Sequence, residues 1–158
     1  MEAGHMGKEI FIVHHIFGYV GYGYEKRKPP DQFRQEALSI GLAIKKALRG
    51  TESPIGVYCT ALSNYAEVTA KFIAIALGCM TTKVAKMYLG EEPTEEADKY
   101  ISQLPEPIII LVVSGSFCEF FSRSWVLNLG LPDPGHNLVS HGQWVRLDET
   151  GIVEYSYS

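Results

Sequence analysis

The chain has 158 residues, 46% of them hydrophobic, and a formal net charge of -4 at pH 7. This length and composition suit a single domain with a sizeable core, which we expect over residues 7–158. Acidic and basic residues are mixed along the sequence, so the basic surface of a nucleic-acid-binding protein is not expected. Residues 1–6 lack the apolar core of a signal peptide, and we expect a cloning remnant or a disordered start there.

The cysteines and the apolar runs indicate in which cellular compartment the protein is expected. Cys59, Cys79 and Cys118 are odd in number and lack the spacing of a zinc site or a disulfide framework. No apolar run is long enough to cross a bilayer, because the run at 108–113 is followed by Ser114-Gly115-Ser116. We therefore expect a cytoplasmic protein without membrane partners, and no cofactor or metal is predicted.

In the first half of the chain the pattern predicts a strand, a helix, a strand and a helix. Residues 10–13 are an apolar run that is typical of a short buried strand. Pro29-Pro30-Asp31 then favours the start of a helix, which we expect to end at Gly50. The apolar positions of this helix are Phe33, Ala37, Leu38, Leu42, Ile44 and Leu48.

A second strand is expected over residues 55–59. Asn64, with Glu67 three residues later, predicts the cap of a second helix, which ends at Gly78. The apolar stripe expected on this helix is Val68, Phe72, Ile75 and Ala76. A short strand over 84–89 and a modest helix from Thr94 to a point before Pro105 follow.

The second half of the chain completes the fold prediction. Residues 108–113 are all β-forming and apolar, which is typical of a strand covered on both faces. Ser116 with Glu119 predicts the cap of a helix that ends at Gly130. Residues 144–147 and 152–155 alternate in polarity around a turn and predict a hairpin. The elements predict an α/β three-layer sandwich, with a mostly parallel central sheet, helices on both faces and the C-terminal hairpin at or near one edge.

The helix after Ser116 carries more apolar residues than one buried stripe needs: Phe117, Phe120, Phe121, Trp125 and Leu129. Two explanations stay open. Either part of this helix packs against a second subunit in a homodimer, or the terminal hairpin buries the additional apolar side chains.

Two consecutive histidines, His14 and His15, follow the first predicted strand. Open α/β sheets bind ligands at the C-terminal ends of their strands, where an imidazole can serve as nucleophile, base or ligand. Because side chains alternate along a strand, these two histidines are expected to point in different directions.

Four segments, in this order, then carry a resemblance. They are Ile12-Val13-His14-His15-Ile16-Phe17, the stretch 57–70, Leu111-Val112-Val113-Ser114-Gly115-Ser116, and the closing 142–147. Their order and spacing resemble the histidine phosphatase superfamily, which has the phosphoglycerate-mutase-like fold, in its short SixA-like form. In that family the first segment reads Leu-Val-Arg-His-Gly-Glu, the second contains Arg-Ala-x-x-Thr-Ala, and the third ends in a Ser/Thr-His-Gly turn.

The resemblance implies that a strand-end histidine attacks phosphorus while two arginines and a second histidine stabilise the charge of the transition state. His15 stands at the place of the nucleophile. His14 replaces the first arginine, and Tyr65, or Asn64 if the alignment slips by one, replaces the second. Ser114-Gly115 runs through the place of the second histidine.

The glycine after the nucleophile is also changed, to Ile16, whose side chain is expected to fill space that a phosphate needs. Loss of one preorganised donor typically costs about a hundredfold to a thousandfold in rate, and here several are replaced. We therefore expect a catalytically degenerate domain, a pseudophosphatase that binds a small molecule or a protein, and not an orthodox phosphatase. The residues expected to line its pocket are His14, His15, Asn64, Tyr65, Ser114 and Ser116.

The alternative is a divergent phosphatase or phosphotransfer enzyme in which His15 is the phosphorylated nucleophile. Its replacement cations would be the loop residues Lys26, Arg27 and Lys28, or Arg123, and His136 or His141 would stand in for the second histidine. The loop cations also fit a solvated surface, and the two histidines fit an ordinary loop. A dinucleotide-binding loop and a metal site find only weak support, because neither has the required spacing.

Overall fold

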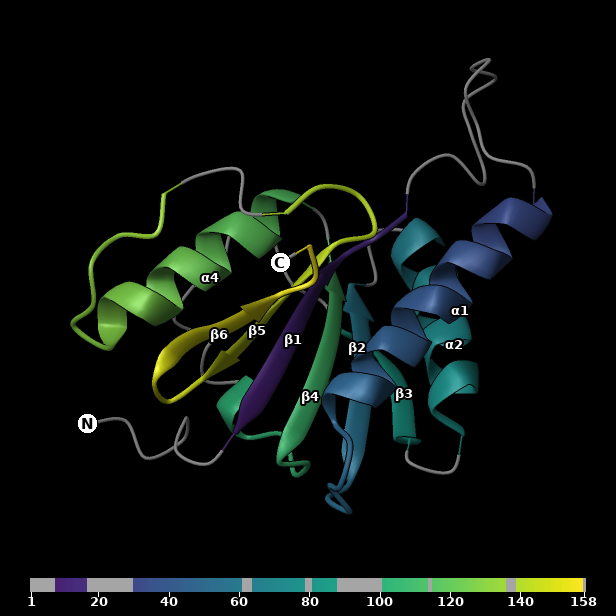
Figure 1. Ribbon diagram of the computed structural model, residues 1–158, viewed down its shortest axis with the longest axis horizontal. Coiled ribbons are helices and arrows are strands. Elements are labelled where there is room, and N and C mark those ends of the chain that lie inside the picture. The colour runs from purple at the N-terminus through teal and green to yellow at the C-terminus, as the bar shows by residue number, and fades with distance from the viewer. Residues whose placement is uncertain are drawn as a thin grey trace.

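The structure is a computed structural model that describes residues 8–16, 30–60, 64–78, 81–87, 101–113, 115–135 and 139–157. A six-stranded sheet with the order β3-β2-β4-β1-β5-β6 forms its centre (Figure 1). The strands are β1 (Glu9–His14), β2 (Ile55–Thr60), β3 (Thr81–Met87), β4 (Ile108–Val113), β5 (Trp144–Asp148) and β6 (Gly151–Tyr155). The labelled helices are α1 (Pro30–Ala47), α2 (Asn64–Leu77) and α4 (Gly115–Asn128).

The sheet is mostly parallel, as the sequence predicts. β1, β4, β2 and β3 run parallel to one another, and β5 pairs antiparallel with β1. β5 and β6 form the C-terminal hairpin, and β6 is the edge strand. The predicted α/β architecture and the position of its hairpin are therefore confirmed.

Helices cover both faces of the sheet and give two hydrophobic layers. α1 and α2 lie together on one side, and α4 lies on the other beside the hairpin (Figure 1). The residues of β4 alternate between the layers: Ile108, Ile110 and Val112 pack with α1 and α2, whereas Ile109, Leu111 and Val113 pack with α4. All six residues of β4 are buried, which confirms that this strand is covered on both faces.

The helices show two corrections to the sequence prediction. Leu42 was placed on the apolar face of α1, but its side chain is 55% exposed. The face of α1 that is buried carries Phe33, Ala37, Ile40, Ile44 and Leu48, spaced three or four residues apart, and Leu42 lies on the opposite side of the helix.

In α2 the predicted stripe is rotated away from the core. The buried positions are Ala66, Ala70, Ile73 and Leu77, and none of them belongs to the predicted stripe. Val68 and Phe72 are only partly buried at the margin of the core, and Ile75 is 65% exposed. Apolar residues outnumber the core positions of this helix, so periodicity alone did not identify its buried face.

The limits of some elements also differ. β3 spans Thr81–Met87 and not 84–89, and α1 ends at Ala47, ahead of Gly50, which has a positive φ of 86°. The helix expected from Thr94 falls outside the described residues except at its end, where residues 101–102 are helical. The expected disordered start at 1–6 also lies outside the described residues.

The aromatic residues of α4 are divided between the core and the surface. Phe117, Phe121 and Trp125 are buried, and the Trp125 Nε1–H donates a 2.7 Å hydrogen bond to the Asp148 carbonyl at the hairpin turn. Phe120 remains 40% exposed. The hairpin therefore helps to bury this helix, which agrees with one of the two explanations given above, burial by the terminal hairpin.

Candidate functional site

The two consecutive histidines lie at the C-terminal end of β1, between its two neighbouring strands. The His15 N–H donates a 3.1 Å hydrogen bond to the carbonyl of Val113, the last residue of β4. The His14 N–H donates a 3.0 Å hydrogen bond to the carbonyl of Gln143, which precedes β5. The backbone of both residues is thus fixed by strands that come from distant parts of the chain.

A third histidine, His141, joins them from the turn before β5. The Gly142 N–H donates to the His14 carbonyl at 2.9 Å, and the Gly142 φ of 80° allows this tight approach. His141 Nδ1 lies 3.1 Å from the His15 carbonyl oxygen. Since a carbonyl only accepts, Nδ1 carries the proton and donates, and Nε2 of a neutral His141 ring is then a hydrogen-bond acceptor.

His14, His15 and His141 form what we call the histidine cluster. The ring centroids of His14 and His141 are 4.1 Å apart, those of His14 and His15 are 5.3 Å apart, and those of His15 and His141 are 5.6 Å apart. The Tyr65 ring, from the first turn of α2, stacks on His15 at 5.7 Å with an interplanar angle of 18°. Three segments of the chain therefore place aromatic rings at one point.

The electrostatics of the cluster favour uncharged imidazoles. Burial lowers the pKa of His14 to about 4, with further lowering by the nearby His141 and His15, against a hydrogen bond to the Val139 backbone. Burial also lowers the pKa of His15, although its hydrogen bond to the Ile16 backbone opposes the shift. Both shifts favour the neutral ring at pH 7.

The hydrogen bonds of the cluster leave polar atoms for a ligand. His15 Nδ1 lies 3.4 Å from the Ile16 carbonyl, which places the proton on Nδ1 and leaves Nε2 with a lone pair that can act as acceptor or nucleophile. The buried Nδ1 of His14 meets no hydrogen-bond partner among the described residues. A buried polar atom of this kind gains when a ligand supplies the missing partner.

Ile16, expected to fill space needed by a phosphate, packs into the hydrophobic core beneath α1 and α2 and is 1% exposed. Its N–H donates to the Thr69 hydroxyl at 3.4 Å, and that hydroxyl donates to the Tyr65 carbonyl at 2.7 Å. The side chain therefore anchors the end of β1 to α2, and the core accommodates its bulk.

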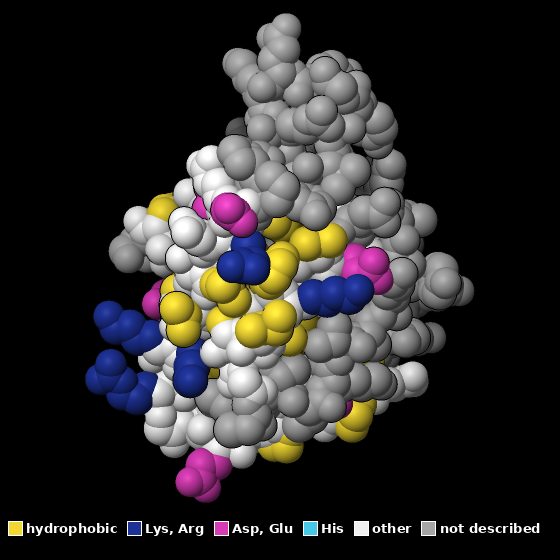
Figure 2. Space-filling model, turned by 90° about the vertical axis from the view of Figure 1, so that its right-hand side faces the viewer, with side chains coloured by type: hydrophobic (Ala, Val, Ile, Leu, Met, Phe, Trp, Pro, Cys, Tyr) yellow, Lys and Arg dark blue, Asp and Glu magenta, His cyan; other side chains and the backbone are white. Residues whose placement is uncertain are grey.

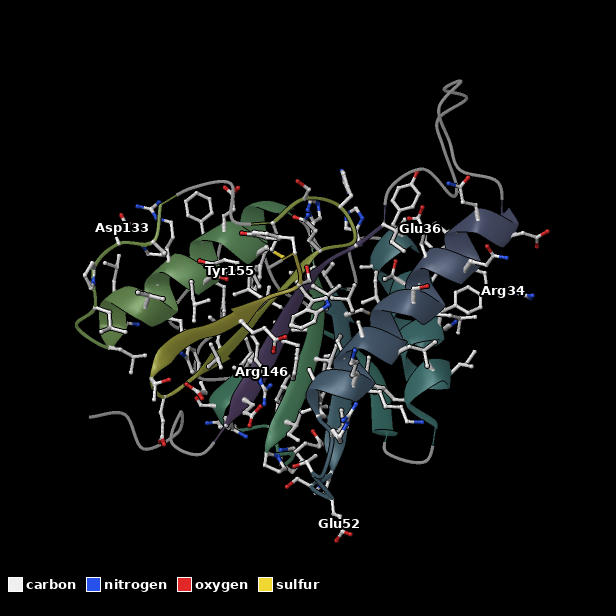
Figure 3. The ribbon with its side chains drawn as sticks, in the orientation of Figure 1. Arg34, Glu36, Glu52, Asp133, Arg146 and Tyr155 are labelled. Carbon is white, nitrogen blue, oxygen red and sulfur yellow. The ribbon has the colours of Figure 1, made fainter. Side chains whose placement is uncertain are left out.

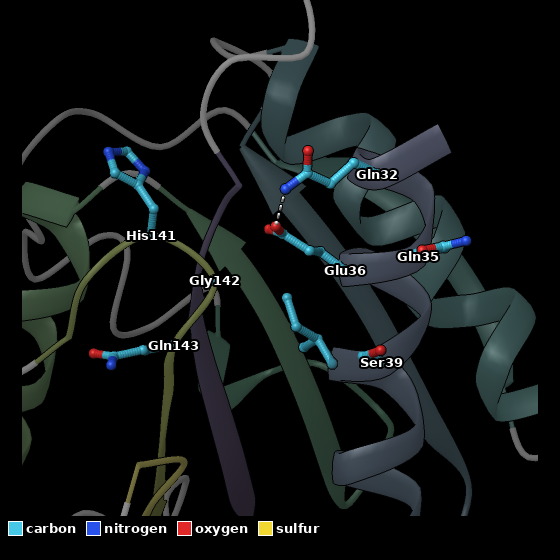
Figure 4. Close-up of a pocket in the computed structure, with 8 residues that line it drawn as sticks. Gln32, Gln35, Glu36, Ser39, His141, Gly142 and Gln143 are labelled. Atoms are coloured by element: carbon cyan, nitrogen blue, oxygen red, sulfur yellow. Dashed lines mark hydrogen bonds between the residues drawn. The ribbon is translucent and has the colours of Figure 1, made fainter. Parts of the chain in front are cut away.

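An open groove of about 470 Å³ adjoins the histidine cluster, in the size range of small-molecule sites. Figure 4 shows His141, Gly142 and Gln143 on one side of it and α1 on the other. Within it, the Gln32 amide donates to the Glu36 carboxylate at 3.5 Å. The lining residues are Gln32, Gln35, Glu36, Ser39, Ile40, His141, Gly142 and Gln143. His141 belongs to both the groove and the histidine cluster, whereas the buried His14 and His15 do not line the groove.

The other predicted site residues divide into two groups. The side chains of Asn64 and Ser116, which lie in the first turns of α2 and α4, are outside the described part of the chain. Ser114, Lys26, Arg27, Lys28 and His136 are also outside it.

Two arginines of the described part, Arg123 and Arg146, form ion pairs. Arg123 Nε and Nη2 bind both carboxylate oxygens of Asp133 at 3.1 and 2.7 Å, beside α4 (Figure 3). Arg146 Nη2 lies 2.6 Å from Glu9. No lysine or arginine of the described residues contributes to the pKa shifts of His14 and His15. The described residues include no group of three or more His, Cys, Asp or Glu side chains arranged to hold a metal ion.

The sequence analysis gave His141 only as a stand-in for the second histidine. His15 and His141 are 126 residues apart, so their contact depends on the pairing of β5 with β1. The resemblance of 142–147 to a closing strand was the available signal, because a strand beside β1 brings the residue before it toward the end of β1. No helix in the described part of the chain combines the length and apolar character needed to span a membrane.

The chain was also compared with known proteins. No protein-family model matches it, and no curated protein sequence does. The protein from Agrobacterium tumefaciens assigned as phosphohistidine phosphatase SixA matches with a TM-score of 0.60 and 14% identity, over 94% of this chain and 96% of that one. Phosphoglycerate mutase from Plasmodium falciparum matches with a TM-score of 0.57 and 16% identity, over 96% of this chain and 92% of that one. The resemblance to the histidine phosphatase superfamily is therefore confirmed at the level of the fold.

Proposed function

We propose that this chain is a catalytically degenerate member of the histidine phosphatase fold, which binds a small molecule or a protein segment at the histidine cluster. The observation that carries the proposal is the burial of His14 and His15, which lowers the pKa of both imidazoles. A phosphoryl site needs fixed positive charge around three oxygens, whereas the lowered pKa values of His14 and His15 favour neutral imidazoles at their positions.

The size of the pKa shift decides between anion capture and hydrogen bonding. With a pKa of about 4, only about one His14 ring in a thousand is protonated at pH 7. His14 occupies the place at which the family resemblance puts an arginine, whose guanidinium stays charged and binds phosphate in a bidentate manner. A dianionic phosphate therefore loses a charge-assisted contact at this position.

The same atoms suit an uncharged ligand that donates hydrogen bonds. Nε2 of His15 and Nε2 of His141 are acceptors in the tautomers set by the backbone. The amide and hydroxyl groups of the groove add further polar contacts. The stacked rings of Tyr65 and His15 provide an aromatic wall.

The test is an assay of the purified chain with an aryl phosphate and with phosphohistidine, followed by denaturing capture of any phosphoprotein. We expect no turnover above the level of the His15→Ala variant and no captured phosphohistidine. Turnover that disappears in His15→Ala would overturn the proposal. Arg123→Ala is the matched control, because it changes a side chain paired with Asp133 and outside the cluster.

A second candidate, a divergent phosphatase, is favoured by the position of His141 near His15. In that reaction His15 Nε2 attacks phosphorus, the bond from phosphorus to the leaving oxygen breaks, and that oxygen takes a proton. Water then hydrolyses the phosphohistidine and regenerates the ring. This candidate requires that His141→Gln slow turnover while His15→Ala abolishes the captured phosphoprotein.

A further inference from the structure

The outer side of α1 and α2 carries apolar side chains that the core leaves partly or largely exposed. We call it the α1–α2 face: Leu38, Leu42, Phe72 and Ile75, with Arg34, Lys45 and Lys71 around them. Leu42 is 55% exposed and Ile75 is 65% exposed. Figure 2 shows hydrophobic side chains gathered at the centre of this side of the molecule, with Lys and Arg side chains and also Asp or Glu side chains around them.

The close packing of the two helices shapes this face. A Cβ atom on Gly41 would lie 2.6 Å from Ala76 Cβ and 2.9 Å from the Ile73 carbonyl oxygen, so the two backbones approach closely at this point. Leu42 follows Gly41 in α1, and Ile75 precedes Ala76 in α2. The two exposed side chains therefore flank the line where the helices meet, and a third helix can lie along it.

The charge around the face points to the character of its partner. Arg34, Lys45 and Lys71 are exposed, whereas the chain as a whole has a net charge of -4. Asp31 at the start of α1 and the partly buried Glu67 offset part of this positive charge. Two copies of the face placed against each other would bring basic rims together, which disfavours self-association through it.

We infer that the α1–α2 face docks an acidic amphipathic helix of another protein. The apolar side of that helix covers Leu42 and Ile75, and its carboxylates lie against the surrounding lysine and arginine side chains. This docking surface is separate from the histidine cluster, so it does not depend on what the cluster binds or on whether the chain hydrolyses phosphate.

The test uses a labelled synthetic helical peptide as long as α1, with leucines along one side and glutamates flanking them. Fluorescence anisotropy measures its affinity for the whole chain, beside a matched peptide in which lysines replace the glutamates. We expect saturable binding of the acidic peptide and binding of the basic peptide at least about tenfold weaker. Ile75→Asp and Lys71→Glu should each weaken the acidic peptide by about tenfold or more.

The matched control is Leu127→Asp on α4, where the side chain is also exposed, at 47%. It should bind the acidic peptide as the unchanged chain does, and circular dichroism shows whether each variant is folded. No binding of the acidic peptide would overturn the inference. A loss of affinity in Leu127→Asp as large as that in Ile75→Asp would also overturn it.

Two further results identify a different occupant and also overturn the inference. One is sedimentation that shows a dimer lost in Leu42→Asp, which identifies a second copy of the chain. The other is binding to vesicles that contain phosphatidylserine without binding of the acidic peptide, which identifies a lipid surface.

Discussion

The pH dependence of folding should change when His14 is replaced by phenylalanine. His14 is buried, and its pKa falls from 6.5 to about 4 in the folded chain. Between these two pH values the unfolded chain binds a proton at this position and the folded chain does not. The stability contributed by the neutral ring is therefore fully present above pH 6.5 and is lost as the pH falls toward 4.

The magnitude follows from the shift. At about 1.4 kcal/mol per pKa unit, the full shift corresponds to roughly 3 kcal/mol, and screening by solvent at the groove reduces this to about 2 kcal/mol. Phenylalanine keeps an aromatic ring at this position and has no proton to bind. Between pH 7 and about pH 4 the free energy of unfolding should fall in both chains. The fall should be about 2 kcal/mol smaller in His14→Phe than in the unchanged chain.

The assay is urea unfolding of both chains, followed by circular dichroism at a series of pH values. The difference between the two free energies of unfolding isolates His14, because His15 and the carboxylates are present in both chains. Parallel pH curves for the two chains would refute the reasoning, since they would mean that His14 has the same pKa in the folded and unfolded states.

Three substitutions test the packing and hydrogen bonds that position the site, and urea unfolding measures each. Gly41→Val should destabilise the fold by roughly 2 kcal/mol or more, because the new Cβ would lie 2.6 Å from Ala76 Cβ. An unchanged urea midpoint would show that α1 and α2 are farther apart. Tyr58→Phe removes the 2.6 Å bond to the buried Glu106 carboxylate and should cost about 1–3 kcal/mol at pH 7, so a neutral result contradicts that bond. Trp125→Phe removes the indole donor to the hairpin turn and should cost about 1 kcal/mol, whereas a gain in stability would argue against it.

The sheet could be predicted from the sequence because its strands have strong local patterns. The all-apolar run at 108–113 became the central strand β4, and the alternation at the end of the chain became the hairpin of β5 and β6. The faces of the helices were predicted less well. In α2, Val68, Phe72 and Ile75 are more hydrophobic than the alanines that face the core, so the deciding factor was the close contact with α1 at Gly41.

The candidate site could be predicted only in part, for a similar reason. His15 was identified because it directly follows a recognisable strand, and Tyr65 because it stands in the first turn of the next predicted helix. His141 joins them through the antiparallel pairing of β5 with β1, which joins residues more than a hundred positions apart. The lowered pKa of His14 likewise results from burial, which no local pattern shows.

The most direct test of the uncharged state of His14 and His15 is NMR measurement of their imidazole nitrogen shifts, assigned with His14→Phe and His15→Ala. We expect neutral His14 and His15 rings at pH 7, with titration of His14 centred near pH 4. A protonated His14 or His15 ring at pH 7 would contradict the central claim, because it would restore positive charge where the family resemblance places a phosphate.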